Sequence, residues 1–271
     1  MTTLPESLET LAVDRPAEHV ARVALVARAM SPTFFAELPQ VMAALDADAD
    51  TRAIVITGAD GRFSYGLDLQ AAAGSLGGVL GDPSAKNREW FLRHVRELQA
   101  SITSVADCRT PTVAAIQGWC VGGGVDLVTA CDVRLASADA LISVREVRMA
   151  MVADIGSLQR LVGIVGDGFL RELALTGDDV SAAEAERIGL VNRTYATAEE
   201  LDAAALALAG RIAANSPLVT RGIKDVLDAE RAPRVEAGLR YVAAWNAAFL
   251  PSADLQEAFT AFAEKRPPRF S

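Results

Sequence analysis

The chain has 271 residues, of which 51% are hydrophobic and 23% are charged, so it is long enough to bury a sizeable core. This composition excludes an intrinsically disordered chain, and the formal net charge of −9 leaves no basic stripe for a nucleic-acid partner. No apolar run approaches the length needed to cross a bilayer, so we expect no membrane partner either.

The first 60 residues alternate between strand and helix patterns. Runs of β-branched residues predict strands over 19–28 and 52–58. Between them, Ser31 is a candidate N-cap and Pro32 follows it at the first helical position. This strand–helix–strand order predicts an α/β layered fold. The glycine-rich segment 71–87 is aperiodic, which fits either a loop over a binding cleft or a simple surface excursion.

A second unit of helices and strands follows. The pattern predicts a helix over 88–105, a strand over 111–118, a helix after the glycine run 122–124, and a strand with a short hairpin over 132–143. From about residue 197 the chain reads as almost wholly helical, with Ala- and Leu-rich stretches at 198–214, 217–229, 232–249 and 251–264. Their apolar faces need a surface to cover, either the core or another subunit. We therefore expect a core over 1–196 and a helical oligomerisation region over 197–271.

The scarcity of cysteine and histidine limits the chemistry. Cys108, Cys120 and Cys131 form no CxxC pair and have mostly apolar or small neighbours, which predicts buried free thiols in a reducing compartment. The two histidines, His19 and His94, are too few for a histidine-built metal site or a Ser-His-Asp triad, so no metal is expected. Chemistry must come from carboxylates and backbone dipoles. The terminal segments match no secretory signal or terminal address motif, and we expect a cytoplasmic location.

Two glycine turns follow predicted strands. In QGWCVGGGVDL (117–127) a strand runs into three glycines before a helix, whose first turn leaves N–H groups free to donate. GRFSYGLDL (61–69) is a second such turn. Each is by itself equally consistent with a plain tight turn. Together they can aim two N–H donors at one developing negative charge, as an acyl-enolate requires.

Together with SLQRL (157–161) and EKRPPRF (264–270), these strings resemble the crotonase superfamily, the enoyl-CoA hydratases and isomerases, from about residue 19 to the C-terminus. The resemblance implies a spiral of ββα turns and a C-terminal helical trimerisation region, assembled as a trimer or a dimer of trimers. It places the two oxyanion-hole N–H donors on Leu67 and Gly123. It also implies an acyl-CoA thioester substrate and no cofactor, because coenzyme A is part of the substrate.

The acidic residues narrow the expected reaction. Asp126 and Glu146 occupy positions where a typical hydratase of this superfamily carries two glutamates, and Asp154 stands where it has glycine. The Δ3,5-Δ2,4-dienoyl-CoA isomerases carry three acids in this arrangement, so the resemblance extends to them. It implies that Glu146 is the base at C2, Asp154 the acid at C6, and Asp126 a neighbour that sets protonation states. Each acid also has a structural interpretation, as a strand-end residue (Glu146), a first-turn helix acid (Asp126) or an N-cap (Asp154).

Two other interpretations stay open at this point. The chain could be a 2-trans-enoyl-CoA hydratase in which Asp126 and Glu146 handle water, or a non-catalytic acyl-CoA-binding protein on the same scaffold. For substrate binding the candidates flank the two turns or lie in the terminal motif; they are Gly66, Tyr65, Trp119 and Lys265. Phe63 is a further candidate for the acyl pocket, with core packing as its alternative.

Overall fold

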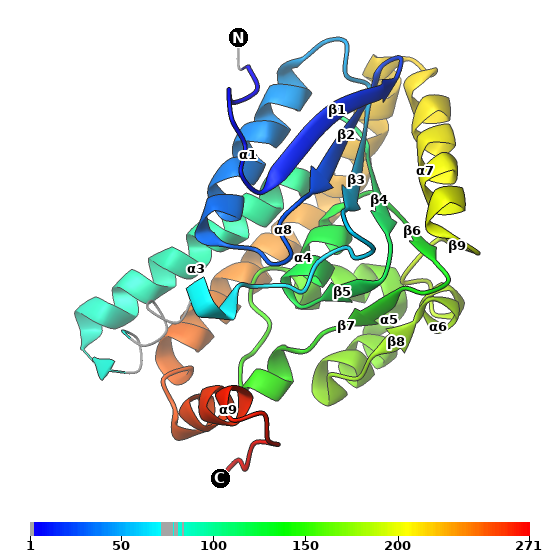
Figure 1. Cartoon of the computed structure of the whole chain (residues 1–271). Helices are drawn as coiled ribbons and strands as arrows, with labels where there is room; N and C mark the ends of the chain where they lie inside the picture. Colours follow the sequence, from blue (N-terminus) through cyan, green and yellow to red (C-terminus); the bar gives the residue numbers. More distant parts are fainter. Residues whose placement is uncertain (1–2, 72–77, 79–80, 83) are drawn as a thin grey trace.

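The computed structural model describes residues 3–71, 78, 81–82 and 84–271, and within them two sheets form the centre of an α/β fold (Figure 1). The larger sheet has six strands in the order β1-β2-β3-β4-β6-β9, with bounds Leu11–Ala17, Val20–Leu25, Ala53–Gly58, Thr112–Ile116, Val133–Ser137 and Arg193–Tyr195. The smaller sheet contains β5 (Trp119–Val121), β7 (Leu141–Ser143) and β8 (Val180–Ser181). The predicted strands over 19–28, 52–58 and 111–118 are confirmed as β2, β3 and β4. The expectation for segment 71–87 falls largely outside the described residues.

Strand β1 was not expected from the sequence. It pairs antiparallel with β2, and the register shifts between Asp14 and Ala17, around Pro16. Proline removes a ladder donor, so a strand that contains it is restricted to a sheet edge or a bulge. Because β1 is the edge strand and its proline lies in the irregular stretch, the local pattern did not resemble a strand.

The hairpin expected over 132–143 is wrong. β6 pairs in parallel with β4 and β9, whereas β7 pairs with β5 and β8, so the two strands belong to different sheets. The short turn between them carries the chain from the large sheet to the small one. The chain thus repeats a unit of one strand in each sheet followed by a helix, as in β4-β5-α4 and β6-β7-α5, which is the expected spiral of ββα turns.

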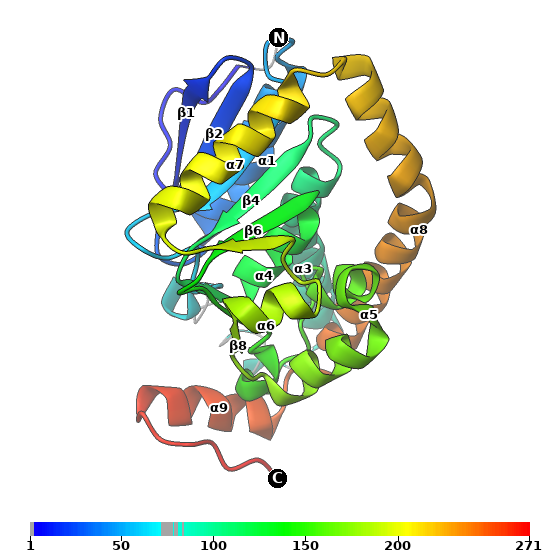
Figure 2. The ribbon, with the colours of Figure 1, turned by 90° about the vertical axis from the view of Figure 1, so that its right-hand side faces the viewer.

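Helices cover both faces of the large sheet. Their bounds are α1 Pro32–Ala47, α3 Ala85–Ala106, α4 Gly123–Ala130, α5 Ser157–Thr176, α6 Ala182–Arg187, α7 Ala198–Ala213, α8 Pro217–Phe249 and α9 Ala253–Ala263, with a 3₁₀ turn η1 over Glu146–Met149. Ser31 caps α1 as predicted, because its hydroxyl accepts a hydrogen bond from the Phe34 N–H. Side chains of α1 and α4 contribute to the main core on one face, and the small-residue face of α7 covers the other (Figure 2).

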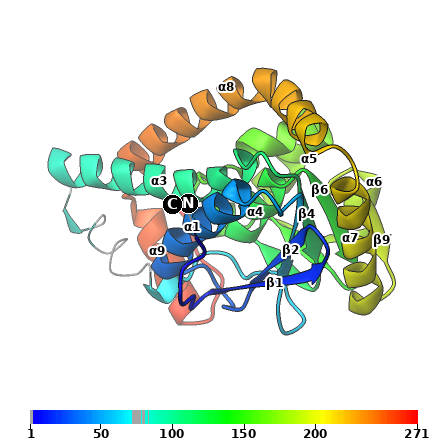
Figure 3. The same cartoon turned by 90° about the horizontal axis from the view of Figure 1, so that it is seen from above.

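The C-terminal region differs from the expected pair of helices over 217–229 and 232–249. They form one long helix, α8, with Pro233 inside it. Proline has no N–H to donate to the carbonyl of the previous helical turn, so one backbone hydrogen bond is missing there. A helix commonly bends at such a position without ending. Figures 2 and 3 show α8 as an arc that stands away from the rest of the chain at its middle. The division at residue 196 stays a prediction, and α7, the first helix after it, packs on the core sheet.

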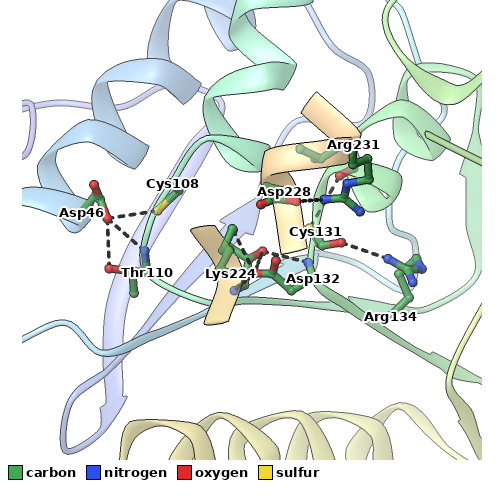
Figure 4. A network of polar contacts seen from close by, with 11 residues as sticks. Asp46, Cys108, Thr110, Cys131, Asp132, Arg134, Lys224, Asp228 and Arg231 are labelled. Carbon is green, nitrogen blue, oxygen red and sulfur yellow. Dashed lines mark hydrogen bonds and ion pairs between the residues drawn. The ribbon is translucent and has the colours of Figure 1, made fainter. Parts of the chain in front are cut away.

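Buried polar contacts hold the beginning of α8 against the core (Figure 4). The Lys224 ammonium, on α8, lies 2.9 Å from a carboxylate oxygen of Asp132, which also accepts from the Thr112 N–H.

All three cysteines are free and buried as predicted, and burial raises the pKa of the Cys108 and Cys131 thiols to about 12. No helix in the described part of the chain is both long and apolar enough to cross a membrane.

Candidate active site

The two glycine turns meet at the N-terminus of α4. Residues 66–68 run beside Met30, whose N–H donates to the Gly66 carbonyl at 2.8 Å and whose carbonyl accepts from the Asp68 N–H at 3.0 Å. The preceding stretch is tied to β5 in the same way, since the Val121 N–H donates to the Ser64 carbonyl at 3.0 Å. These contacts fix the first turn directly against the second.

Close backbone approach explains the glycines at both turns. Gly66 has a φ of +80°, and a Cβ there would lie 2.6 Å from the Val121 carbonyl oxygen and 3.2 Å from the Gly123 nitrogen. A Cβ on Gly123 would lie 2.9 Å from the Met30 sulfur and 3.7 Å from the Leu67 nitrogen. Within the described residues, neither the Leu67 N–H nor the Gly123 N–H donates to a protein acceptor. Two free donors so close together can hold one anionic oxygen.

Substitution of Gly66 by alanine tests this arrangement. The added methyl group would press on the Val121 carbonyl and displace the Leu67 N–H, so we expect turnover to fall by roughly 10²- to 10³-fold, as for loss of one oxyanion donor. The matched control is Gly210→Ala in α7, where the methyl group meets no atom within 4 Å. Full activity of Gly66→Ala in a steady-state assay would contradict the proposed hole.

Glu146 begins the 3₁₀ turn η1 and faces the second glycine turn. Its Oε1 would lie 3.3 Å from a Cβ on Gly122, and its Oε2 is buried without a hydrogen-bond partner. Burial, and then the neighbouring carboxyl groups of Asp126 and Asp154, raise the pKa of Glu146 to about 8. The alternative role of Glu146, as a strand-end residue exposed to solvent, is therefore wrong. A desolvated carboxyl group with a pKa near neutrality can exchange protons at physiological pH.

Asp126 lies in the first turn of α4 and is fully buried. Its Oδ1 accepts from the Ser157 N–H at 2.5 Å, and its Oδ2 has no partner. Burial raises the pKa of Asp126 to about 6, although the bond from Ser157 opposes the shift. The expected N-cap role of Asp154 is wrong: Gly156 occupies that position, and Asp126 satisfies an N–H of the first turn of α5 from another helix.

Asp154 is held by two amide side chains that sequence reasoning missed. Its Oδ2 accepts from Asn246 Nδ2 at 2.6 Å, and its backbone carbonyl accepts from Gln99 Nε2 at 2.6 Å. Burial raises the pKa of Asp154 to about 7, and the bond from Asn246 opposes the shift. A signal for Asn246 existed in the sequence, because it is the one polar side chain between Ala243 and Ala247 on the buried face of α8. The sequence contains no sign of its partner.

One cavity of about 440 Å³ brings the predicted residues together. Its lining includes Leu67, Gly123, Glu146 and Asp154 but not Asp126. A smaller and mainly apolar cavity of about 90 Å³ shares Leu67 and Asp154 with it and continues between α1 and α3. Asp154 thus lies where the two cavities meet, whereas Gly123 and Glu146 line only the larger one.

The candidate substrate contacts divide into two groups. Tyr65 and Gly66 line the larger cavity. Trp119 and Lys265 do not: the Arg145 guanidinium covers the Trp119 ring at 5.0 Å, and Lys265 is exposed in the C-terminal tail. Phe63 packs in the core and not in the pocket. From the C-terminal helices, Asn246 and Phe262 reach the cavity, so α8 and α9 contribute to the site.

Comparison with known proteins assigns the class. The profile of the Enoyl-CoA hydratase/isomerase family matches residues 17–271, and the chain belongs to this family of enzymes. It is 44% identical over 244 residues to the peroxisomal Delta(3,5)-Delta(2,4)-dienoyl-CoA isomerase of Arabidopsis thaliana, covering 90% of this chain and 88% of that protein. It is 38% identical to the mitochondrial Delta(3,5)-Delta(2,4)-dienoyl-CoA isomerase of Homo sapiens over 96% of this chain and 81% of that protein. A crystal structure of an enoyl-CoA hydratase/isomerase from Xanthobacter autotrophicus Py2 superposes with a TM-score of 0.83 at 27% identity, over 95% of this chain and 94% of that one.

The expectation of a cytoplasmic location is contradicted by these relatives, whose names place them in peroxisomes or mitochondria. The physical reason is that location is set by short segments read by receptors, and neither the fold nor the composition carries that information.

Proposed function

We propose that this enzyme isomerises 3,5-dienoyl-CoA to 2,4-dienoyl-CoA in fatty-acid degradation. The observation that carries the proposal is a single cavity lined by two N–H donors, at Leu67 and Gly123, and by two carboxyl groups, of Glu146 and Asp154. The names of the relatives support the same reaction. The substrate is an acyl-CoA thioester, and the reaction needs no cofactor because it only moves protons and double bonds.

The first step breaks the C2–H bond. The Glu146 carboxylate takes the proton, and the electron pair enters the thioester to give a conjugated dienolate. The Leu67 and Gly123 N–H groups hold the oxygen that becomes negative, which lowers the barrier because these donors are already in place. The raised pKa of Glu146 strengthens it as a base relative to a solvated carboxylate.

The second step forms a C–H bond at the far end of the diene. Negative charge in the dienolate reaches C6, and Asp154 delivers its proton there, which leaves double bonds at C2 and C4. One carboxyl group cannot easily serve carbons so far apart, and the position of Asp154 at the junction of the two cavities suits the distal carbon. After turnover Glu146 is protonated and Asp154 is ionised. Proton exchange with solvent must then return Glu146 to the carboxylate and Asp154 to the neutral acid.

The contacts of Asp126 favour isomerisation over hydration. In a hydratase Asp126 would hold water together with Glu146, but its Oδ1 is occupied by the Ser157 N–H and the residue is fully buried outside the cavity lining. We assign Asp126 an electrostatic role, because its charge is among the causes of the raised pKa of both Glu146 and Asp154.

A side-by-side assay tests the proposal. We expect the enzyme to convert 3,5-dienoyl-CoA to the 2,4-isomer, followed by the absorbance of the diene conjugated with the thioester, much faster than it adds water to 2-trans-enoyl-CoA. Faster hydration that is insensitive to Asp154→Asn would support the hydratase alternative. Binding of CoA thioesters without turnover in either assay would support the non-catalytic alternative.

The pH dependence follows from the two pKa values. The reaction needs one proton on the pair of Glu146, with a pKa of about 8, and Asp154, with a pKa of about 7. In the reactive arrangement this proton is on Asp154, which the order of the two pKa values makes the less populated of the two singly protonated forms. Below this window both carboxyl groups are protonated and no base remains, whereas above it both are ionised and no acid remains. We expect a narrow bell-shaped profile of kcat/KM with its maximum between these values, measured over roughly pH 5 to 10. A flat profile across neutrality would contradict the shared proton.

We further propose that the enzyme assembles as a trimer or a dimer of trimers through α8. Five apolar side chains on the first part of this helix are 56–82% exposed: Leu218, Val219, Ile223, Val226 and Leu227. Such a contiguous apolar patch is unusual on a monomer and typical of an interface. Lys265 of the tail is then a candidate contact for the CoA of a neighbouring subunit.

Substitution of Leu227 by glutamate tests this assembly. The side chain is 70% exposed in the single chain, so the change should cost the monomer little but should place a charge inside an interface. We expect light scattering after size exclusion to show a fall in mass toward one chain. The control is Leu175→Glu on α5, which is 73% exposed in the single chain. An unchanged mass for Leu227→Glu would place the interface elsewhere.

A further inference from the structure

Asn246 is a buried amide whose orientation is determined by its partners. It lies on α8, is 2% exposed, and its Nδ2 donates to the Val152 carbonyl at 2.9 Å as well as to Asp154 Oδ2 at 2.6 Å. A backbone carbonyl can only accept a hydrogen bond, so the NH₂ end of the amide must face it. The same NH₂ group therefore donates to Asp154 and cannot accept a proton from it.

A second buried amide fixes the backbone at the same residue. Gln99 on α3 is 2% exposed, and its Nε2 donates to the Asp154 carbonyl at 2.6 Å and to the Leu239 carbonyl of α8 at 3.0 Å. α3 and α8 pack against each other beside this segment (Figure 1). The main chain and the side chain of Asp154 are thus held separately, by one amide from each helix.

The contact from Asn246 determines which oxygen of Asp154 carries the proton. In a neutral carboxyl group one oxygen bears the hydrogen and the other accepts hydrogen bonds. Because Oδ2 accepts from Asn246, the hydrogen of the neutral acid belongs on Oδ1. A proton on Oδ2 would point at an NH₂ group that has no accepting lone pair.

We propose that Asn246 is a positioning residue that orients Asp154 and places its transferable proton on Oδ1, ready for delivery to C6 of the substrate. The inference rests on the proposed dienoyl-CoA isomerase function and deepens it. It assigns to α8, in the C-terminal helical region, a direct influence on the second proton transfer and none on the first, which belongs to Glu146.

The test separates the two proton transfers. Asn246→Leu keeps the approximate volume and removes the donor, and Asn246→Ala removes the donor with a smaller side chain if the leucine variant fails to fold. For either variant we expect kcat on 3,5-dienoyl-CoA to fall by about 10- to 100-fold with KM nearly unchanged. Exchange of the C2 proton with solvent deuterium should stay within about threefold of wild type, because Glu146 and the two N–H donors are untouched. The matched control is Asn215→Leu, an exposed asparagine on the segment after α7, which should leave both rates unchanged.

A double-mutant cycle distinguishes positioning from a purely structural role. In an Asp154→Asn background, Asn246→Leu should change the residual turnover by less than about threefold, because its effect passes through the Asp154 carboxyl group. An equal loss in both backgrounds, or a parallel fall of C2 exchange and turnover, would overturn the inference. Wild-type turnover in every Asn246 variant would overturn it too. Failure of the wild-type enzyme itself to isomerise 3,5-dienoyl-CoA would instead refute the proposed function.

Discussion

Replacement of Glu146 by glutamine is expected to lower turnover of 3,5-dienoyl-CoA by roughly 10²- to 10⁴-fold, the usual range for loss of a general base. Glutamine fills the same space but cannot take the C2 proton. The Leu67 and Gly123 N–H groups would still bind the thioester oxygen, so KM should change little. Exchange of the C2 proton with solvent deuterium, followed by mass spectrometry, should be lost together with turnover.

The control for this variant is Glu184→Gln. Glu184 is a surface acid of α6 that pairs with Arg187, and its replacement should leave both rates at the wild-type level. Retained C2 exchange in Glu146→Gln would mean that another group takes the C2 proton, and the assignment of Glu146 as base would be wrong.

Replacement of Asp154 by asparagine should lower turnover by a similar factor, roughly 10²- to 10⁴-fold, but should leave C2 exchange near the wild-type rate. The first proton transfer and the oxyanion hole do not involve Asp154, whereas delivery of a proton at C6 does. Opposite behaviour of the two variants in the exchange assay is therefore the clearest signature of two separate carboxyl groups. Rapid turnover by Asp154→Asn would refute the three-acid mechanism.

The Asp154→Asn variant should also change how the stability of the folded chain depends on pH. Folding raises the pKa of Asp154 from 3.8 to about 7, so the folded chain binds this proton more tightly, and stability falls as pH rises through that window. Above it the ionised form of this partly buried carboxyl group is destabilising, and asparagine removes that charge. We expect Asp154→Asn to melt no lower than wild type at pH above about 7, while Asp167→Asn on the surface serves as the neutral control.

The sequence alone determined the features that depend on neighbouring residues. Strands β2, β3 and β4 and the Ser31 cap follow from local side-chain chemistry, and the motif strings around Leu67 and Gly123 were sufficient to indicate the family. The role of the glycines in these strings can also be inferred from the local sequence, because a tight turn that exposes N–H groups needs residues without a Cβ. The sequence did not distinguish a cap from a catalytic acid at Asp154.

Only the tertiary structure decided the features that join distant segments. The Asp126 carboxyl group satisfies the Ser157 N–H from another helix, and Asn246 meets Asp154 across 92 positions of sequence. β6 and β7 look like a hairpin locally but pair with partners in different sheets. Burial, which raises the pKa of all three acids, likewise comes from the whole fold. Hydrogen-bond partners and desolvation depend on positions in space, and for this reason the residue types indicated the reaction while the fold determined which acid faces which partner.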